Sequence, residues 1–336
     1  MEPTLALPAL IALIGIALAF DFINGLHDAS NSIATVVSTR VLTPAMAVAW
    51  AAFFNLIAFL FIGLHVAETI GKGIIDPAIV DPIVVLGALS GAILWNVFTW
   101  YFGIPTSSSH ALVGGLVGAG TAKAGTGAIV SSGVIKTTVF IVAAPVLGMI
   151  ISIIIVILSS WVFKPMPAQT ADKAFRRLQL LSSAAYSIGH GANDAQKTMG
   201  VIAVLLFSTG YIHGNFHVPL WVILAAQVAM GLGTLMGGWR IVRTMGSKIT
   251  RLTPHQGFCA ETGGAMLLFG ATAFGIPVST THTITGSIMG VGAARRASAV
   301  RWGVAGNIVI AWVVTIPAAA AIAATVYSIT TALRLV

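Results

Sequence analysis

The chain has 336 residues, of which 57% are apolar and only 8% are charged, and its mean hydropathy is +0.97. Such a small number of polar side chains cannot cover the surface of a water-soluble protein. The composition therefore excludes a soluble enzyme or binding module and predicts an all-α polytopic membrane protein. The formal net charge of +8 then indicates basic cytoplasmic loops rather than nucleic-acid binding.

The first apolar run extends from Leu5 to about Ser38 and carries polar residues in its middle. Residues 21–31 read Asp-Phe-Ile-Asn-Gly-Leu-His-Asp-Ala-Ser-Asn. Glycine and clustered polar groups at this depth predict one tilted crossing whose helix is broken between Asn24 and Asp28. Ionisable groups inside a bilayer cost about 2.5–3.5 kcal/mol on insertion scales, so these acids need partners or a water-filled cavity.

Further elements follow in the first half of the chain. Residues 44–63 predict a second helix, and residues 83–102 predict a third. Residues 103–110 read Gly-Ile-Pro-Thr-Ser-Ser-Ser-His and precede a glycine-rich stretch. This pattern predicts a chain break and then a short half helix or re-entrant helix that starts at Ser/Thr residues. Residues 132–163 predict a long membrane span.

The hydrophilic segment 164–177 separates two halves of the chain. It holds Pro165, Pro167 and four basic side chains against the single acid Asp172. We therefore divide the chain into a first repeat (1–163), a cytoplasmic basic linker (164–177) and a second repeat (178–336).

The second half repeats the motifs of the first. The stretch 24–31, Asn-Gly-Leu-His-Asp-Ala-Ser-Asn, aligns with 190–197, His-Gly-Ala-Asn-Asp-Ala-Gln-Lys. The stretch 102–110, Phe-Gly-Ile-Pro-Thr-Ser-Ser-Ser-His, aligns with 274–282, Phe-Gly-Ile-Pro-Val-Ser-Thr-Thr-His. Both motifs keep nearly the same separation in the two halves, which indicates an internal duplication.

Basic residues indicate how the halves are oriented. If the clusters within 164–177, 240–251 and 295–301 all face the cytoplasm, counting crossings places both termini outside and gives about 10 membrane segments. The first polar motif then crosses inward and the second crosses outward, so the two repeats have inverted topology. Inverted repeats with discontinuous helices are typical of secondary transporters, whose sites lie near the bilayer midplane.

The polar motif of the first half predicts a cation site. Asp21, Asn24, Asp28 and Asn31 offer carboxylate and amide oxygens, which suit sodium, and we expect such an ion at Asp21, Asn24 and Asp28. The two copies differ, because Ser187 stands at the place of Asp21 and Lys197 at the place of Asn31.

Lys197 gives the second copy two alternative functions. Its ammonium could occupy the place of a cation beside Asp194, so that protonation supplies the coupling. It could instead be a permanent counter-charge for the substrate. The sequence leaves both alternatives open.

The two Ser/Thr stretches predict a site for a small oxyanion. Each places hydroxyls and free backbone N–H groups at the start of a short helix, where the helix dipole favours an anion. The alternative is that these residues only cap or pack their helices. The candidate substrate ligands are Thr106, Ser107, Ser108, Ser109, Ser279, Thr280, Thr281, Asn31 and Asn193.

Several other polar residues have two interpretations. His110 and His282 could bind the anion or cap a helix, and His27 and His190 could carry a coupled proton or donate packing hydrogen bonds. Glu261 could belong to the site or pair elsewhere to hold helices together. An enzyme is disfavoured, because the adjacent Ser109 and His110 would not face each other on a helix.

The duplicated Asn-Asp motifs and the duplicated Gly-Ile-Pro-Xaa-Ser-Xaa-Xaa-His resemble the inorganic phosphate transporter (PiT) family, and more closely its compact bacterial low-affinity permeases. This resemblance covers essentially the whole chain. It implies import of phosphate, free or as a metal complex, by symport with sodium or protons across the bacterial inner membrane. It also implies a homodimer and no cofactor other than the coupling cation.

The resemblance assigns the signature acids and amides to Asp28, Asn31, Asn193 and Asp194. Two departures, His27 and Lys197 in place of Asn, leave the choice between sodium and protons open. Sulfate transporters of the same family leave the anion open, and an anion channel is a further alternative that uphill accumulation would exclude.

Overall fold

The computed structural model describes residues 5–333, and within them every regular element is helical. This confirms the all-α prediction. The longer elements in chain order are α1 (Leu7–Ser38), α2 (Pro44–Leu56), α3 (His65–Gly73), α4 (Pro82–Phe102), α5 (Ser108–Ala124), α6 (Ser131–Phe163), α7 (Ala168–Ser208), α8 (Leu220–Met236), α9 (Trp239–Arg243), a π-helical turn η4 (Thr244–Lys248), α10 (Pro254–Ala273), α11 (Thr280–Arg295) and α12 (Trp302–Ala332).

Helix α1 passes through the first polar motif without a break, so the predicted interruption between Asn24 and Asp28 is wrong. Helix α7 likewise passes through the second motif. The glycine has another purpose: a Cβ on Gly25 would collide with the backbone carbonyl of Met230 in α8. Small residues allow helix backbones to approach closely in membranes, so this glycine packs two helices together rather than breaking one.

The helices are discontinuous at other places. Helix α4 ends at Gly103 (φ 67°) and α5 begins at Ser108, while Gly275 (φ 62°) lies in the loop before α11. Positive φ is accessible to glycine at little cost, which explains the turn at each place. The predicted short helices that start at Ser/Thr residues are therefore confirmed.

Two bends also recur. The helix predicted for residues 44–63 ends at Leu56, and α3 follows after a bend of 81°. In the second half, α8 and the α9–η4 segment meet at 61°. The order of a bent pair, a long helix, a short helix and a last long helix thus occurs twice.

The segment 164–177 is mostly helical rather than an extended linker. Only residues 164–167 lie between α6 and α7, because α7 begins at Ala168. An Asp172–Arg176 pair at 2.8 Å, spaced one helical turn apart, favours this start.

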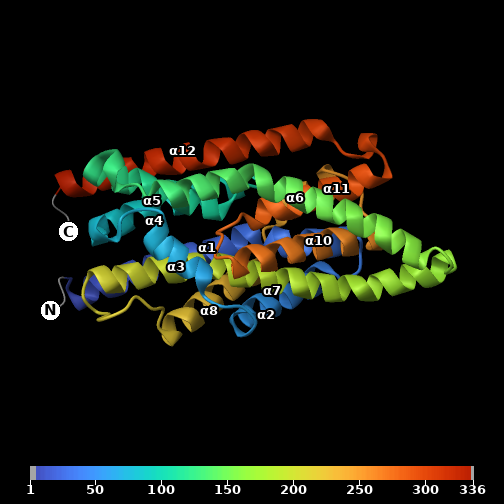
Figure 1. The fold of residues 1–336 in the computed structure, drawn as a ribbon, viewed down its shortest axis with the longest axis horizontal. Helices are drawn as coiled ribbons and strands as arrows, with labels where there is room; N and C mark the ends of the chain where they lie inside the picture. The colour runs from blue at the N-terminus through green and yellow to red at the C-terminus, as the bar shows by residue number, and fades with distance from the viewer. Residues whose placement is uncertain (1–4, 334–336) are drawn as a thin grey trace.

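The two halves interlock (Figure 1). Helix α6 packs on α10 and α11, α12 packs on α4 and α5, and α1 packs on α8 and α7. The two ends of the described chain lie at one end of the molecule, and the α6–α7 turn and the end of α11 lie at the other (Figure 1). The basic residues of 164–177 and 295–301 therefore share one end.

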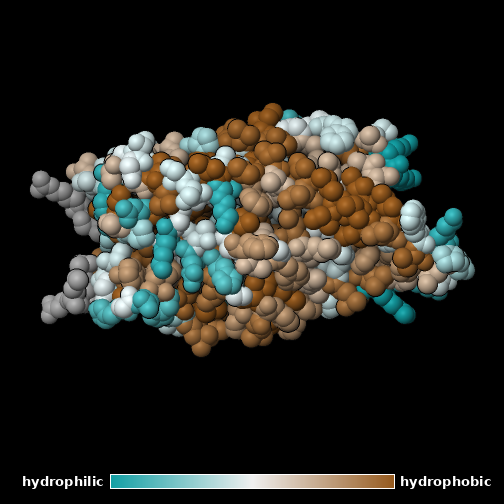
Figure 2. All heavy atoms as spheres, in the orientation of Figure 1, coloured by the Kyte–Doolittle hydropathy of each residue, from teal (hydrophilic) through white to brown (hydrophobic). Residues whose placement is uncertain are grey.

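Hydrophobic side chains cover most of the middle of the visible face, and hydrophilic ones gather at the α6–α7 tip and near the opposite end (Figure 2). In residues 5–333, four helices are long and apolar enough to cross a membrane, or up to six if each bent pair is one span. Helix α7 is not among these candidate spans, because its composition is too polar. The total of about 10 segments and the external position of both termini remain predictions.

Candidate functional site

The two polar motifs meet in the interior, where α1 and α7 pack together. Asp28 and Asp194 are 2% and 0% exposed, and Lys197 is 1% exposed. One ligand atom from each of Asp28, His190 and Asp194 lies within 4.8 Å of the others. Buried charges of this kind are stable only when paired, so their partners define the site.

Each central acid has a cationic or polar neighbour. Asp28 Oδ1 lies 2.6 Å from His27 Nδ1. Asp194 Oδ1 accepts a hydrogen bond from Lys197 Nζ at 2.5 Å, and Asp194 Oδ2 lies 3.2 Å from His190 Nε2. Among residues 5–333, Asp194 therefore has a built-in ammonium partner, whereas the hydrogen-bond partner of Asp28 is the ring of His27.

The two short helices start beside these acids. Ser107 and Ser279 each accept a hydrogen bond from the backbone N–H three residues later, at 3.2 and 3.1 Å. These two serines are N-caps. Their side chains are thus engaged by their own helices, whereas Ser108 Oγ is buried without a hydrogen-bond partner among the described residues.

Lys197 joins both short helices. Its ammonium donates to Ser109 Oγ in α5 and to the Val278 carbonyl, 2.9 Å away, in the loop before α11. On the other side, Asn31 Nδ2 donates to Thr280 Oγ1 at 3.2 Å and Thr281 Oγ1 at 2.9 Å. The starts of α5 and α11 therefore converge on α1 and α7.

Thr280 links this convergence to the acids. Its hydroxyl donates to Asp194 Oδ2 at 2.9 Å. Its backbone carbonyl accepts from Tyr186 Oη at 2.9 Å. Tyr186 was not among the predicted residues, because a single aromatic residue in a long helix gives no signal for such a contact.

Corresponding residues of the two halves make corresponding contacts. Lys197 with Ser109 and Asn31 with Thr281 form one such pair of contacts. A second pair of contacts is similar, although its threonines are one position out of register: His27 Nε2 lies 3.1 Å from Thr99 Oγ1, and Asn193 Nδ2 donates to Thr272 Oγ1 at 2.8 Å. Thr99 and Thr272 were missed by the sequence analysis, although both stand a few residues before the duplicated Gly-Ile-Pro.

Two predicted ligands lie beside the centre. Thr106 Oγ1 lies 3.3 Å from His27 Nε2 and donates to Thr99 at 3.0 Å. Asn193 also donates weakly to the Ile276 carbonyl at 3.4 Å. These contacts hold the loops that precede α5 and α11.

Asp21 and Asn24 form a separate polar group. Because α1 is continuous, the seven residues from Asp21 to Asp28 span about 10.5 Å, so the two acids do not share one cage as predicted. Both carboxylate oxygens of Asp21 and Oδ1 of Asn24 are buried without hydrogen-bond partners in the described chain. Thr198 of α7 lies beside Asp21 and was not predicted. These unsatisfied oxygens fit a cation.

The two predicted histidines of the short helices contact each other. The rings of His110 and His282 are 4.6 Å apart, and His282 stacks on Trp312 of α12 at 3.8 Å. His282 Nδ1 also contacts the Ile141 carbonyl of α6 at 3.2 Å. The pair therefore joins α5, α11 and α12 behind the converging hydroxyls.

Glu261 lies apart from this centre. Its carboxylate accepts from Ser182 Oγ at 2.5 Å and from Gln179 Nε2 at 3.2 Å. These partners are on α7 and the acid is on α10, so its hydrogen bonds hold two helices together.

Each loop before a short helix is held by a threonine from the other half. Thr69 Oγ1 donates to the Gly275 carbonyl at 2.8 Å, and Thr244 Oγ1 donates to the Gly103 carbonyl at 3.1 Å. We refer to these two contacts as the threonine latches.

Comparisons with known proteins agree with this architecture. Residues 24–323 match the model of the phosphate transporter family. The chain is 65% identical to a probable low-affinity inorganic phosphate transporter of Rhizobium meliloti, over 97% of this chain and 98% of the relative. It is 44% identical to a protein of the same description in Bacillus subtilis, over 93% and 94% of the two chains.

A solved structure described as "the sodium-dependent phosphate transporter" is also similar. It superimposes with a TM-score of 0.87 at 28% identity, over 98% of this chain and 100% of that one.

Proposed function

The chain belongs to the phosphate transporter family, and from that premise we propose that it imports inorganic phosphate together with a cation by alternating access. The observation that carries this proposal is the convergence of the starts of α5 and α11 on Lys197 and Asn31, beside Asp28 and Asp194. Hydroxyls and helix N-termini favour an oxyanion, and the buried acids beside them favour cations.

The two halves, 1–163 and 178–336, are proposed to be inverted repeats. The matched contacts support this, since Lys197–Ser109 and Asn31–Thr281 join corresponding positions, as do the threonine latches. Rocking of two such units about a central site is the common mechanism of secondary transporters.

Phosphate is proposed to bind among Ser108, Ser109, Thr280 and Thr281. Ser108 Oγ is an unused donor, and the other three hydroxyls contact Lys197, Asn31 or Asp194, which an anion could replace as partners. Neutral donors at two helix starts would surround a tetrahedral anion without a high cost in buried charge.

The mobile cation is proposed to bind at Asp21, Asn24 and Thr198. The three unsatisfied oxygens of Asp21 and Asn24 support this position. A divalent anion is costly to bury until cations enter with it, so cation binding and phosphate binding are coupled by charge. Sodium would be held directly by these oxygens, and a proton would instead neutralise Asp21.

Lys197 is proposed to replace a second mobile cation. It contacts Asp194 at 2.5 Å and reaches both short helices. Its charge would then compensate Asp194 and help to hold the anion. Fewer mobile cations would be needed for each phosphate than in a protein with Asn at this position.

Uptake of radiolabelled phosphate into proteoliposomes tests this function. We expect accumulation above equilibrium that requires an inward sodium or proton gradient and is inhibited by arsenate. If sulfate inhibits phosphate uptake as strongly as arsenate does, sulfate is the alternative substrate. Flux that only equalises the two compartments would assign a channel.

A further inference from the structure

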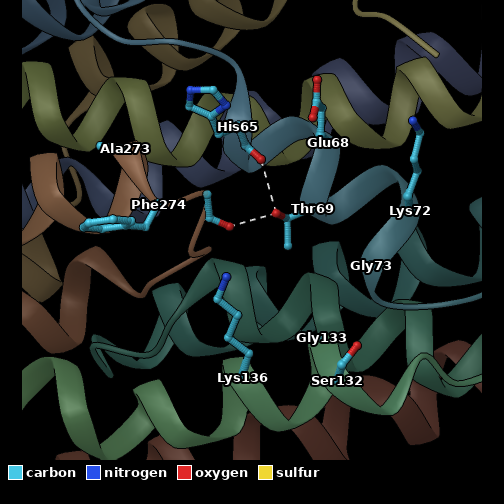
Figure 3. A pocket seen from close by; sticks show the side chains of 11 residues that line it. His65, Glu68, Thr69, Lys72, Gly73, Ser132, Gly133, Lys136, Ala273 and Phe274 are labelled. Atoms are coloured by element: carbon cyan, nitrogen blue, oxygen red, sulfur yellow. Dashed lines mark hydrogen bonds between the residues drawn. The ribbon is translucent and has the colours of Figure 1, made fainter. Parts of the chain in front are cut away.

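A polar cleft of about 640 Å³ opens on the molecular surface between α3, the start of α6 and the loop after α10. Figure 3 shows its lining. The charged and polar side chains around it are His65, Glu68, Thr69, Lys72, Ser132 and Lys136. The cleft lies in the part of the molecule nearer to the ends of the described chain, which the proposed orientation places outside (Figures 1 and 2).

One loop separates this cleft from the buried site. Ala273, Phe274 and Gly275 line the cleft, and residues 276–279 continue from them into the start of α11. The same loop is held from the inside, because Lys197 donates to the Val278 carbonyl at 2.9 Å. Its outer side is held by Thr69, which donates to the Gly275 carbonyl at 2.8 Å.

Lys136 extends from α6 toward Thr69, whose hydroxyl holds the Gly275 carbonyl (Figure 3). The ammonium forms no hydrogen bond or ion pair with residues 5–333. Glu68 and Lys72 extend from α3 away from Lys136 (Figure 3), and Lys72 Nζ lies over the Phe216 ring at 4.5 Å. Lys136 is thus a half-buried cation beside the loop, with no carboxylate partner in the described part of the chain.

The corresponding cleft of the other half differs in chemistry. Pro145 in α6 and Pro317 in α12 are as far apart in the sequence as Phe102 and Phe274 of the duplicated motif. The same distance separates Lys136 from Ile308, so these two residues occupy corresponding positions of the two halves. Ile308 lines a cleft over the Gly103–Pro105 loop whose other walls are mainly aromatic and aliphatic, with Lys248 as its charged residue. The two clefts therefore carry their lysines at different places: the polar cleft has Lys136 at the position where the other cleft has Ile308, and the other cleft has Lys248.

We propose that this cleft is an entrance site, in which Lys136 binds a tetrahedral oxyanion at the outer face of the Gly275–Ser279 loop before the loop opens. Ser132 and His65 also line the cleft, and the acid Glu68 and the base Lys72 both point away from Lys136 (Figure 3). A cation in a cleft raises the local anion concentration and the association rate. The inference rests on the proposed function, because the anion that would pass to the buried site is phosphate.

A cysteine variant gives the direct test of binding. Cys259 is the single cysteine and is buried, so Ser132→Cys in a Cys259→Ala background has one accessible thiol in the cleft and keeps Lys136. We expect inorganic phosphate to slow modification of this thiol by a sulfonatoethyl thiol reagent. Lys123→Cys is the matched control, because Lys123 is exposed and pairs with Asp81 at 2.6 Å outside the cleft. Phosphate should not protect it.

If modification of the cleft thiol is slowed by a higher content of anionic phospholipid but not by free phosphate, the cleft binds lipid headgroups and the proposal is overturned. Equal reactivity with and without phosphate in all lipids would also overturn it. This assay needs binding only, so it is informative even if uptake experiments reject the proposed function.

Transport kinetics give the second test. Lys136→Ala removes one positive charge close to the bound anion. We expect it to raise KM for phosphate about fivefold and to leave kcat within about twofold of the wild-type value. An aminoethyl reagent on Lys136→Cys should restore KM, and Lys136→Arg should keep it near the wild-type value. A lower kcat with unchanged KM in Lys136→Ala would indicate a structural effect and contradict an entrance site.

Discussion

The polar motif of α1 and that of α7 have the same framework but different charges. Both place an acid at the centre, Asp28 or Asp194, and both send a donor to the opposite short helix, Asn31 or Lys197. The α1 motif adds Asp21, whose oxygens have no hydrogen-bond partner among the described residues. The α7 motif has Ser187 there and a fixed ammonium instead. A duplicated site can thus divide its charge compensation between a mobile cation and a built-in one.

The largest effect should come from removing what the two motifs share. Asp28→Asn and Asp194→Asn should each reduce the initial rate of phosphate uptake at least about 100-fold, since loss of one partner of a buried pair costs about 3–5 kcal/mol. Uptake by membrane vesicles, normalised to the amount of inserted protein, measures this. A rate within a few-fold of wild type in either variant would exclude a central role for that acid.

A second comparison separates the two motifs. Asp21→Asn should reduce cation-driven uptake by about 10- to 100-fold, because the proposed cation loses its carboxylate ligand. Ser187→Ala at the corresponding position should change uptake less than about twofold. Cation dependence of uptake is the measurement, with phosphate held constant. Equal effects of the two changes would show that the halves are not specialised.

The sequence predicted a large part of this arrangement. The duplicated motifs identified the central acids and the short helices that begin at Ser108 and Thr280, because chain breaks and N-caps depend on local residue types. It did not predict that α1 continues through Asn24–Asp28. A glycine that breaks a helix and one that packs a helix look alike in sequence, and only the nearby Met230 backbone distinguishes them.

The ligands themselves were predicted less completely. Thr198, Thr99 and Thr272 are single hydroxyls in long helices, where such residues are common and usually bond to their own backbone. Glu261 satisfied the same criterion as the central acids but lies against Gln179 and Ser182. Which buried polar residues share a cluster depends on how α1, α7 and α10 cross, and this is a property of tertiary packing.

The smallest effects should come from the threonine latches. Thr69→Val and Thr244→Val each remove one hydrogen bond of about 1 kcal/mol between the halves, so each should change kcat by no more than about fivefold. Thr69 holds the loop of the polar cleft, and Thr244 holds that of the apolar cleft. We expect the two variants to favour opening toward opposite sides, measured by thiol labelling of single cysteines on the two loops. The same labelling change in both would contradict independent gates.

The central claim is that Lys197 takes the place of a mobile cation. Exchanging it for the residue of the α1 motif, Lys197→Asn, should create the need for one more cation per phosphate. The dependence of phosphate uptake on the coupling cation should then steepen from a Hill coefficient of about one in the wild type to about two in the variant. An unchanged Hill coefficient in a variant that still transports phosphate would contradict the account.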